Sequence, residues 1–466
     1  MHDPEADYVF HLLSFEGPDP YARAGGIATR ITGLAKALAG LGFETHLWFV
    51  GDPALPGHAT HDGVSLHRWC QWISANTPQG VYDGEVAKEA DYASSLPPFL
   101  FESMRLHLSK GGRAAILAEE WHTVHAVLHL DWLLRTAGLR QQVDILWNAN
   151  NTFGFERIDW ARLSDAATVT TVSRYMRQRM WDLGVDAMVV PNGIPPEAVR
   201  PPTPVAVRSF RAGLGNRIVL SKVARWDPDK RWLLAVETIA ALRHSGCHPL
   251  LIARGGKESH AQEVLARAAA LGLRTERRVM KTEGARGLIH TVSAPSHQAD
   301  VLLLDSPLDR EACRLLFGGS SAVLANSGHE PFGLVGLETM GAGGVACTGG
   351  TGEDYAVAGW NSLMLQTVDP LEFVRQFRRL QADPEEERLL RRNGLATAER
   401  FTWPGIVRRN LLPLLGIRVA SETQGSLPSP TLRHPRSRDA RVLRPDAGRH
   451  RRSERSAPRP REPASS

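Results

Sequence analysis

The chain has 466 residues, a formal net charge of +5 and 42% hydrophobic residues. This length predicts two or three domains, and this composition is ordinary for a protein with real hydrophobic cores. The positive charge is confined to residues 421–466, which contain eleven Arg, no Lys and five acidic residues and so carry +6. Subtracting +6 from +5 leaves −1 on residues 1–420. A near-neutral body argues against a protein built to bind nucleic acid specifically.

The four cysteines, at positions 70, 247, 313 and 347, lie far apart and form no CxxC pair. This spacing indicates neither a zinc ribbon nor a disulfide framework, and it favours a reducing compartment. No apolar run approaches the roughly 20 residues of a membrane span. The acidic start of the chain, residues 1–7, is unlike a signal peptide. We therefore expect a soluble cytoplasmic protein.

The first elements along the chain predict a βαβ unit. Residues 8–15 form an apolar run typical of a buried strand, and Gly25 and Gly26 follow it. Residues 27–38 then place apolar side chains at helical spacing, and residues 45–50 form the next strand. A strand, a glycine loop, a helix and a strand in this order indicate a parallel sheet.

The same alternation continues to residues 188–190, stops at the proline-rich residues 195–204, and restarts with a strand at 218–223. We read the proline-rich stretch as a linker between two doubly wound α/β domains. The last stretch is rich in Arg, Pro and Ser and has few large apolar residues, so it is expected to be disordered. The predicted boundaries are 1–200 for the N-terminal domain, 205–395 for the C-terminal domain, 396–418 for closing helices and 419–466 for the tail.

The strongest chemical signal is a pair of acidic residues, Glu330 and Glu338, separated by eight positions. Glu330 follows a predicted strand, and Glu338 lies inside the next predicted helix. Eight residues of helix span about 12 Å, roughly the distance from a sugar across a diphosphate to a ribose. Between the two, the backbone N–H groups of Gly333 and Leu334 stand at a helix N-terminus, which suits a diphosphate.

The segment Glu330-Pro-Phe-Gly-Leu-Val-Gly-Leu-Glu338, followed by Gly343-Gly344, resembles the Glu-x7-Glu signature of retaining GT-B glycosyltransferases. The resemblance is to family four and the glycogen-synthase-like group. Three further stretches fall in the order expected for these enzymes. They are Gly25-Gly26-Ile-Ala, Val190-Pro-Asn-Gly-Ile194 and Ala224-Arg225-Trp-Asp-Pro-Asp-Lys230. The resemblance covers about residues 1–415 and implies two Rossmann-like domains that face each other across a cleft.

Arg225 and Lys230 are the predicted cations for the leaving diphosphate, because cleavage of a sugar–phosphate bond builds negative charge there. They flank the turn at Asp227-Pro228-Asp229, which is itself an Asp-x-Asp, the motif with which metal-dependent transferases hold a divalent cation. We do not expect a metal or another cofactor, because Lys230 and Arg231 follow directly and would repel a cation.

The resemblance also implies roles for individual residues. Glu338 would bind the ribose hydroxyls, and Glu330 would contact the donor sugar as a catalytic residue. In the family, the loop equivalent to Gly25 and Gly26 closes on the donor from the acceptor domain.

The stretch Ala118-Glu-Glu-Trp-His-Thr123 is similar to a His-Asp-Trp-His-Thr stretch of glycogen synthases whose first His lies near the donor sugar. That position is Glu119 here, which departs from the family pattern. Glu119, Glu120 and His122 are therefore candidate contacts for sugar hydroxyls or for the acceptor, with ordinary loop polarity as the alternative.

Together these signals predict a retaining glycosyltransferase that moves a hexosyl unit from a nucleotide-sugar donor to a carbohydrate or another hydroxyl acceptor. The alternatives are a sugar phosphorylase or a nucleotide-sugar epimerase on the same fold. From another class, the chain could be a non-catalytic polyanion-binding protein that acts through its basic tail. The tail could also contact an anionic surface peripherally.

Overall fold

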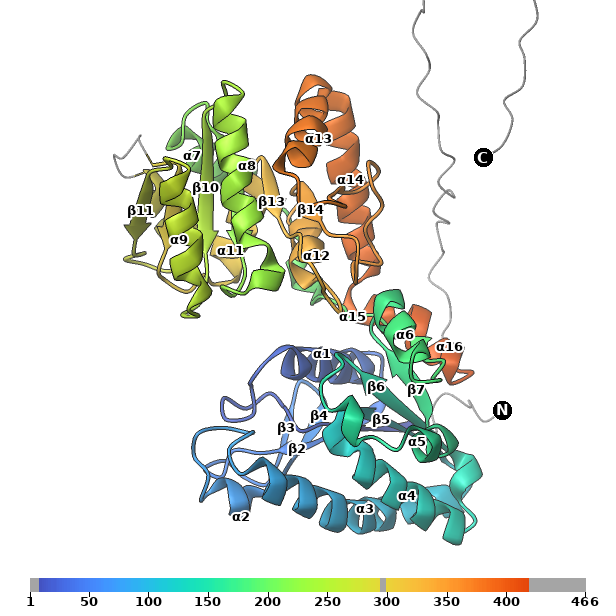
Figure 1. Ribbon diagram of the computed structural model, residues 1–466. Coiled ribbons are helices and arrows are strands. Elements are labelled where there is room, and N and C mark those ends of the chain that lie inside the picture. Colours follow the sequence, from blue (N-terminus) through green and yellow to red (C-terminus); the bar gives the residue numbers. More distant parts are fainter. Residues whose placement is uncertain (1–7, 294–298, 419–466) are drawn as a thin grey trace, which may run out of the picture. The chain divides into compact units, whose positions relative to one another are not determined.

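The computed structural model describes residues 8–293 and 299–418 (Figure 1). The arginine-rich tail, with its predicted disorder and surface contact, lies outside the described residues. Two parallel sheets organise the described part of the chain, as the sequence predicted, and the expectation of two Rossmann-like domains is confirmed. Of the helices that are described, none combines the length and the apolar character needed to cross a membrane.

The first sheet has eight strands in the order β3-β4-β2-β1-β5-β6-β7-β8. All neighbouring strands run parallel except β3 and β4, which form an antiparallel hairpin. The chain winds outward from β1 in one direction and then from β5 in the other. The strands are β1 Tyr8–Leu13, β2 Glu44–Val50, β3 His58–His61, β4 Val64–Trp69, β5 Arg113–Glu119, β6 Val143–Ala149, β7 Thr168–Thr171 and β8 Met188–Val189.

The second sheet has seven strands in the order β11-β12-β10-β9-β13-β14-β15, all parallel. Its winding reverses between β9 and β13. The strands are β9 Ile218–Val223, β10 Pro249–Arg254, β11 Thr275–Arg278, β12 Val301–Leu304, β13 Ala322–Leu324, β14 Ala346–Thr348 and β15 Leu363–Met364. In sheets of this kind, ligands bind beyond the carboxyl ends of the strands where the order reverses.

Helices cover both faces of each sheet (Figure 1). In the first half these are α1 Gly26–Gly40, α2 Gln71–Ser74, α3 Glu85–Ser109, α4 Val124–Thr136, α5 Trp160–Ala166 and α6 Arg174–Trp181. In the second half they are α7 Pro204–Ala212, α8 Trp232–His244, α9 His260–Ala270, α10 Gly284–Ser293, α11 Arg310–Gly319, α12 Leu334–Gly341, α13 Pro370–Ala382, α14 Pro384–Arg400, α15 Trp403–Ile406 and α16 Leu412–Leu414.

The end of the described chain returns to the first sheet. Trp403 of α15 is buried in the same apolar cluster as Ile31 and Leu34 of α1. Gly33 makes this contact possible, because a Cβ at that position would lie 2.1 Å from the indole Nε1 of Trp403. The close approach explains why a helix-weakening glycine stands in the middle of α1.

Candidate active site

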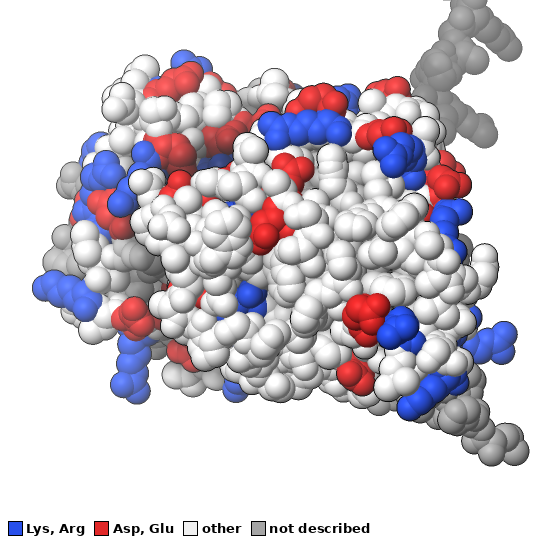
Figure 2. Space-filling view, turned by 90° about the horizontal axis from the view of Figure 1, so that it is seen from below, with Lys and Arg blue, Asp and Glu red and all other residues white. Residues whose placement is uncertain are grey.

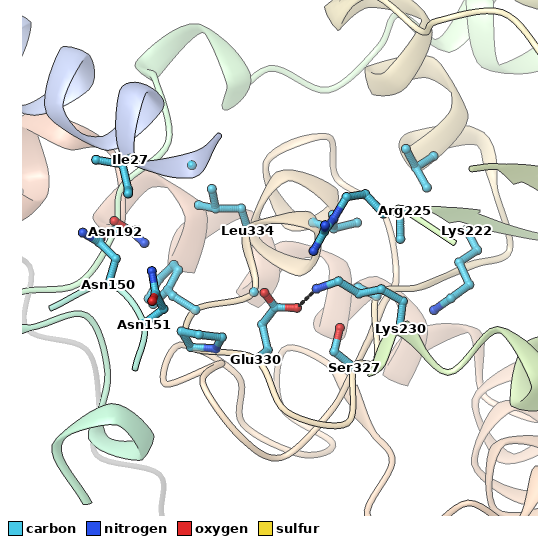
Figure 3. A pocket seen from close by; sticks show the side chains of 18 of the residues that line it. Ile27, Asn150, Asn151, Asn192, Lys222, Arg225, Lys230, Ser327, Glu330 and Leu334 are labelled. Carbon is cyan, nitrogen blue, oxygen red and sulfur yellow. Dashed lines mark hydrogen bonds and ion pairs between the residues drawn. The ribbon is translucent and has the colours of Figure 1, made fainter. Parts of the chain in front are cut away.

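A pocket of about 470 Å³ opens where β9 and β13 end, at the point where the winding of the second sheet reverses (Figure 3). Residues of both halves of the chain line it. The first half contributes Glu16, Gly26, Ile27, Asn150, Asn151 and Asn192; the second half contributes Lys222, Val223, Ala224, Arg225, Lys230, Leu324, Ala325, Ser327 and residues 330–335.

Lys230 and Glu330, both predicted from the sequence, meet in this pocket as an ion pair between Nζ and Oε2 (Figure 3). Lys230 ends a short 3-10 turn that starts at Pro228, and the carboxylate of Asp227 caps this turn by accepting the N–H of Asp229 at 2.9 Å. On the other side, the backbone N–H of Glu330 donates to the hydroxyl of Thr351 at 3.1 Å. Lys230 is thus positioned by a turn of its own loop, and Glu330 by a hydroxyl group of the loop after β14.

Arg225 also lines the pocket, and its backbone is more constrained than its side chain. Its carbonyl oxygen accepts from the indole N–H of Trp232 at 2.7 Å, and the N–H of the next residue, Trp226, donates to Glu258 at 2.9 Å. Its guanidinium is 70% exposed and lies 3.7 Å from the Asp227 carboxylate, a loose contact. The side chain therefore keeps the freedom to reach an anionic ligand.

Gly333 and Leu334 lie at the wall of the pocket, where α12 begins. Gly333 is the N-cap and no side chain caps this helix, so its first N–H groups have no partner from a cap. A Cβ at Gly333 would lie 3.0 Å from the side chain of Glu353. Glu338 stands one turn beyond Leu334 and is not among the residues that line the pocket. Burial raises the pKa of its carboxyl to about 7, and Arg310 acts in the opposite direction.

Lys222 is a pocket residue that the sequence reasoning missed. It lies near the end of β9, is 2% exposed, and donates from Nζ to the carbonyl oxygen of Leu324 at 2.8 Å. Burial lowers the pKa of Lys222 to about 7, and the nearby cations Lys230 and Arg231 add to this effect. A lysine inside a mostly apolar strand was the available signal.

Glu353 ends the glycine-rich loop after β14 and does not itself line the pocket. Its carboxyl is buried, and Oε1 has no hydrogen-bond partner among the described residues. Burial raises the pKa of Glu353 to about 7, and the neighbouring carboxylate of Glu330 raises it further. A carboxyl with a pKa near neutral therefore lies directly behind the loop that carries Glu330 and Gly333.

The candidate contacts Glu119, Glu120 and His122 do not line the pocket. Glu119 is buried in an ion pair with Arg30, at 3.0 Å, and also accepts from the amides of Asn148 and Asn150. The structure thus engages Glu119 with other parts of the first half.

Glu120 has a left-handed backbone (φ 66°) and accepts the N–H of Asn150 at 2.7 Å. Burial raises the pKa of Glu120 to about 8. His122 is stacked between Phe15 and Trp121 and is hydrogen bonded to Glu85 at 2.8 Å. Burial lowers the pKa of His122.

The backbone N–H groups of the glycine loop are capped by a carboxylate from the same half of the chain. Glu16, which follows β1, accepts the N–H of Gly25 at 2.8 Å and that of Ala28 at 3.0 Å. Of the two glycines, Gly26 lines the pocket and Gly25 does not. The acidic residue between the first strand and the glycine loop was visible in the sequence, but only the fold shows that it caps α1.

The Asp-x-Asp pair has structural contacts in this part of the chain. Asp227 caps the turn described above, and Asp229 lies 3.5 Å from Nδ1 of His329. Within residues 8–293 and 299–418, no group of three or more His, Cys, Asp or Glu side chains is arranged to hold a metal ion. Activity without a metal stays a prediction, to be tested with a chelator.

Comparison with known proteins agrees with this architecture. Residues 24–198 match Glycosyltransferase Family 4. No curated protein matches the sequence. Sucrose-phosphate synthase from Thermosynechococcus elongatus is 19% identical, with a TM-score of 0.57, over 87% of this chain and 98% of that chain.

Two ligand-bound structures are similar in the same way. The catalytic domain of starch synthase IV from Arabidopsis thaliana, bound to ADP and acarbose, is 16% identical with a TM-score of 0.58, over 85% of this chain and 96% of that chain. The Anabaena protein HepE, in complex with UDP and glucose, is 14% identical with a TM-score of 0.55, over 88% of this chain and 99% of that chain. Residues 24–198 are thus similar to Glycosyltransferase Family 4, and the two sheets together have the GT-B fold of these solved structures.

Proposed function

We propose that this protein is a retaining glycosyltransferase that transfers a hexosyl unit from a nucleotide sugar to a hydroxyl acceptor. One observation carries the proposal: Arg225, Lys230 and the uncapped start of α12 converge on one pocket that also holds Glu330. Two cations and free N–H groups around one volume suit a diphosphate, and a carboxylate beside them suits sugar hydroxyls or a positively charged transition state. The ligands in the structures of starch synthase IV and HepE support the same class of donor.

In this proposal Arg225 and Lys230 hold the diphosphate, with the N–H groups of Gly333 and Leu334. Glu338 binds the ribose hydroxyls from the next turn of α12, and Glu330 contacts the donor sugar. The bond from the anomeric carbon to the phosphate oxygen breaks while the bond to the acceptor oxygen forms on the same face. The acceptor proton passes to the leaving phosphate, so the anomeric configuration is retained.

The test is a donor panel with the purified full-length protein. UDP-, ADP- and GDP-sugars are assayed for hydrolysis and transfer, and NMR of an early product reports the anomeric configuration. We expect turnover of at least one donor with retention, and a loss of about 100-fold or more in kcat for Arg225→Ala. Absence of binding and turnover with every nucleotide sugar contradicts the proposal. If the protein instead cleaves an oligosaccharide in a phosphate-dependent reaction, it is a phosphorylase.

Polyanion binding is less well supported as the main function. On the face in Figure 2, described Lys and Arg side chains lie beside Asp and Glu side chains instead of gathering into a basic patch. Residues 1–420 carry −1 as a whole. We therefore expect a truncation to residues 1–420 to keep its transferase activity. Salt-sensitive polyanion binding that disappears in this truncation would assign that property to the tail.

A further inference from the structure

The charges around the pocket are divided between its two sides. The three cations that line it, Lys222, Arg225 and Lys230, all belong to the second half of the chain. Among the described residues that line it from the first half, none is Lys or Arg, and Glu16 carries the one ionisable side chain. Figure 3 shows the labelled asparagines on one side of Glu330 and these cations on the other.

On the side of the pocket that the first half of the chain forms, the N-terminus of α1 is capped by a carboxylate of the same half. Helix α1 begins at Gly26, where free N–H groups and the helix dipole would otherwise attract an anion. Oε2 of Glu16 already accepts the N–H groups of Gly25 and Ala28, and Oε1 accepts the hydroxyl of Tyr82 at 2.7 Å. An incoming phosphate would therefore find a carboxylate where it needs donors.

Two of the three asparagines on this side offer side-chain N–H groups; the third, Asn150, donates its own to Glu119. Oδ1 of Asn192 accepts from the guanidinium of Arg30 at 2.9 Å, and Oδ1 of Asn151 accepts from the backbone N–H of Phe153 at 2.7 Å. The guanidinium and the backbone N–H can only donate, so the atom that accepts from each is the oxygen of the carboxamide. The Nδ2 group of each asparagine is not used in these two hydrogen bonds. Such groups donate to neutral hydroxyl oxygens, while the Glu16 carboxylate, which is buried and already accepts three hydrogen bonds, repels a second anion.

A second row of carboxyl groups lies behind this wall. Glu120 is close enough to Glu16 for the two to interact, and Glu85 is paired with His122. Arg30, which donates to Asn192, is buried against Glu119 and the carbonyl oxygens of Val190 and Pro191. Its guanidinium is therefore already used within the protein.

We infer that the acceptor is a hydroxyl-rich molecule without phosphate or carboxylate groups, bound on the side of the pocket formed by Glu16, Asn151 and Asn192. This inference rests on the proposed transfer reaction and adds the chemical class of its acceptor. A sugar phosphate carries a charge of roughly −1.5 to −2 and would stand against Glu16 with no lysine or arginine of that wall to neutralise it. An uncharged sugar meets amide donors for its hydroxyl oxygens and carries no negative charge for Glu16 to repel.

The experiment compares matched acceptors with the full-length protein and the donor that the panel identifies. The pairs are glucose with glucose 6-phosphate and fructose with fructose 6-phosphate, and release of the nucleotide above donor hydrolysis is measured. In any pair that supports transfer, we expect the uncharged sugar to be preferred by about 100-fold or more in kcat/KM. Equal or better use of the phosphorylated sugar overturns the inference while the transferase function stands. Absence of any donor turnover overturns the function first and the inference with it.

Two variants and a binding measurement complete the test. Asn151→Lys adds a cation to this wall and should reduce the kcat/KM ratio of the uncharged to the phosphorylated sugar about tenfold. The control Asn151→Gln adds no charge and should leave this ratio unchanged. The same preference in both variants contradicts a charge effect at this wall. If no sugar of the panel accepts the hexosyl unit, the shift in melting temperature that each sugar causes is measured in the presence of the nucleoside diphosphate. A saturable shift with glucose 6-phosphate that glucose does not produce overturns the inference, and the reverse supports it.

Discussion

The ammonium group of Lys230 contacts the carboxylate of Glu330, although 100 positions separate these residues in the sequence. The pair joins the loop after β9 to the loop after β13, at the edge where the winding of the sheet reverses. In the proposed reaction, this contact joins the group that stabilises the leaving phosphate to the group that faces the sugar.

Removing either partner of this pair should impair catalysis. Lys230→Ala deletes a cation at the developing negative charge, so kcat should fall by about 100- to 1,000-fold. Glu330→Gln keeps the shape of the side chain but removes its charge, and we expect kcat to fall by a similar factor. Steady-state kinetics with the identified donor provides the measurement. The control is Lys257→Ala, an exposed lysine of the same half that does not line the pocket. Activity near wild type in both Lys230→Ala and Glu330→Gln would remove these residues from the mechanism.

Binding of the donor should take up a proton at Lys222. Burial lowers the pKa of Lys222 to about 7, so much of this side chain is neutral at pH 8. An anionic diphosphate favours the charged form and raises this pKa, so binding takes up as much as about one proton and weakens as pH rises from 7 to 9. Calorimetry of nucleoside diphosphate binding in two buffers of different ionisation enthalpy measures the uptake. Lys222→Met should abolish it and Lys257→Met should not; an unchanged uptake in Lys222→Met assigns the proton elsewhere.

The buried lysine also predicts how stability changes with pH. The folded protein releases the Lys222 proton near pH 7, whereas the unfolded chain keeps it to about 10.4. Between these values the unfolded state binds more protons, so this group's contribution to the free energy of unfolding rises with pH. Lys222→Met should therefore stabilise the protein more at pH 6 than at pH 9, as measured by urea unfolding. A gain that is the same at both pH values would mean that Lys222 is not neutralised by burial.

The pair of Arg30 and Glu119 should matter for stability more than for chemistry. The two side chains are 3% and 2% exposed and lie 3.0 Å apart. Arg30→Met leaves a buried carboxylate without its counter-charge, so the free energy of unfolding should fall by about 3–5 kcal/mol. The matched control is Arg105→Ala, which breaks the exposed pair with Glu102 and should cost less than about 1 kcal/mol. Adding Glu119→Leu to Arg30→Met should recover part of the loss; a further loss instead would argue against the unpaired charge as the cause.

A chelator should leave the activity unchanged. Asp227 and Asp229 are used in a turn cap and a contact with His329, and Lys230 follows them directly. We expect the same rate in EDTA and in added Mg²⁺ or Mn²⁺, since cationic side chains take the role of the metal. Loss of activity in EDTA that returns with a divalent cation would assign Asp227 and Asp229 as metal ligands.

Local patterns in the sequence predicted the alternation of strands and helices, the two parallel sheets and the loop positions of Arg225, Lys230 and Glu330. Each of these features depends on residues within a few positions of one another, such as an apolar run, a glycine turn or a helix start. The long helix α3 was not predicted; it contains Pro97 and Pro98, and proline is disfavoured inside a helix.

Only the tertiary structure decided which polar groups are free to meet a ligand. Glu119 looked like a candidate sugar contact, but Arg30 reaches it from 89 positions away. Glu16 and Lys222 became visible as pocket residues only in the fold, and Glu353 as the buried carboxyl packed against Gly333. Burial and pairing sum the contributions of atoms that are distant in the chain, so no local pattern reports them. The sequence by itself thus determined the fold and the Glu-x7-Glu motif, whereas the folded packing determined the pKa values of the buried groups and the division of charge between the two sides of the pocket.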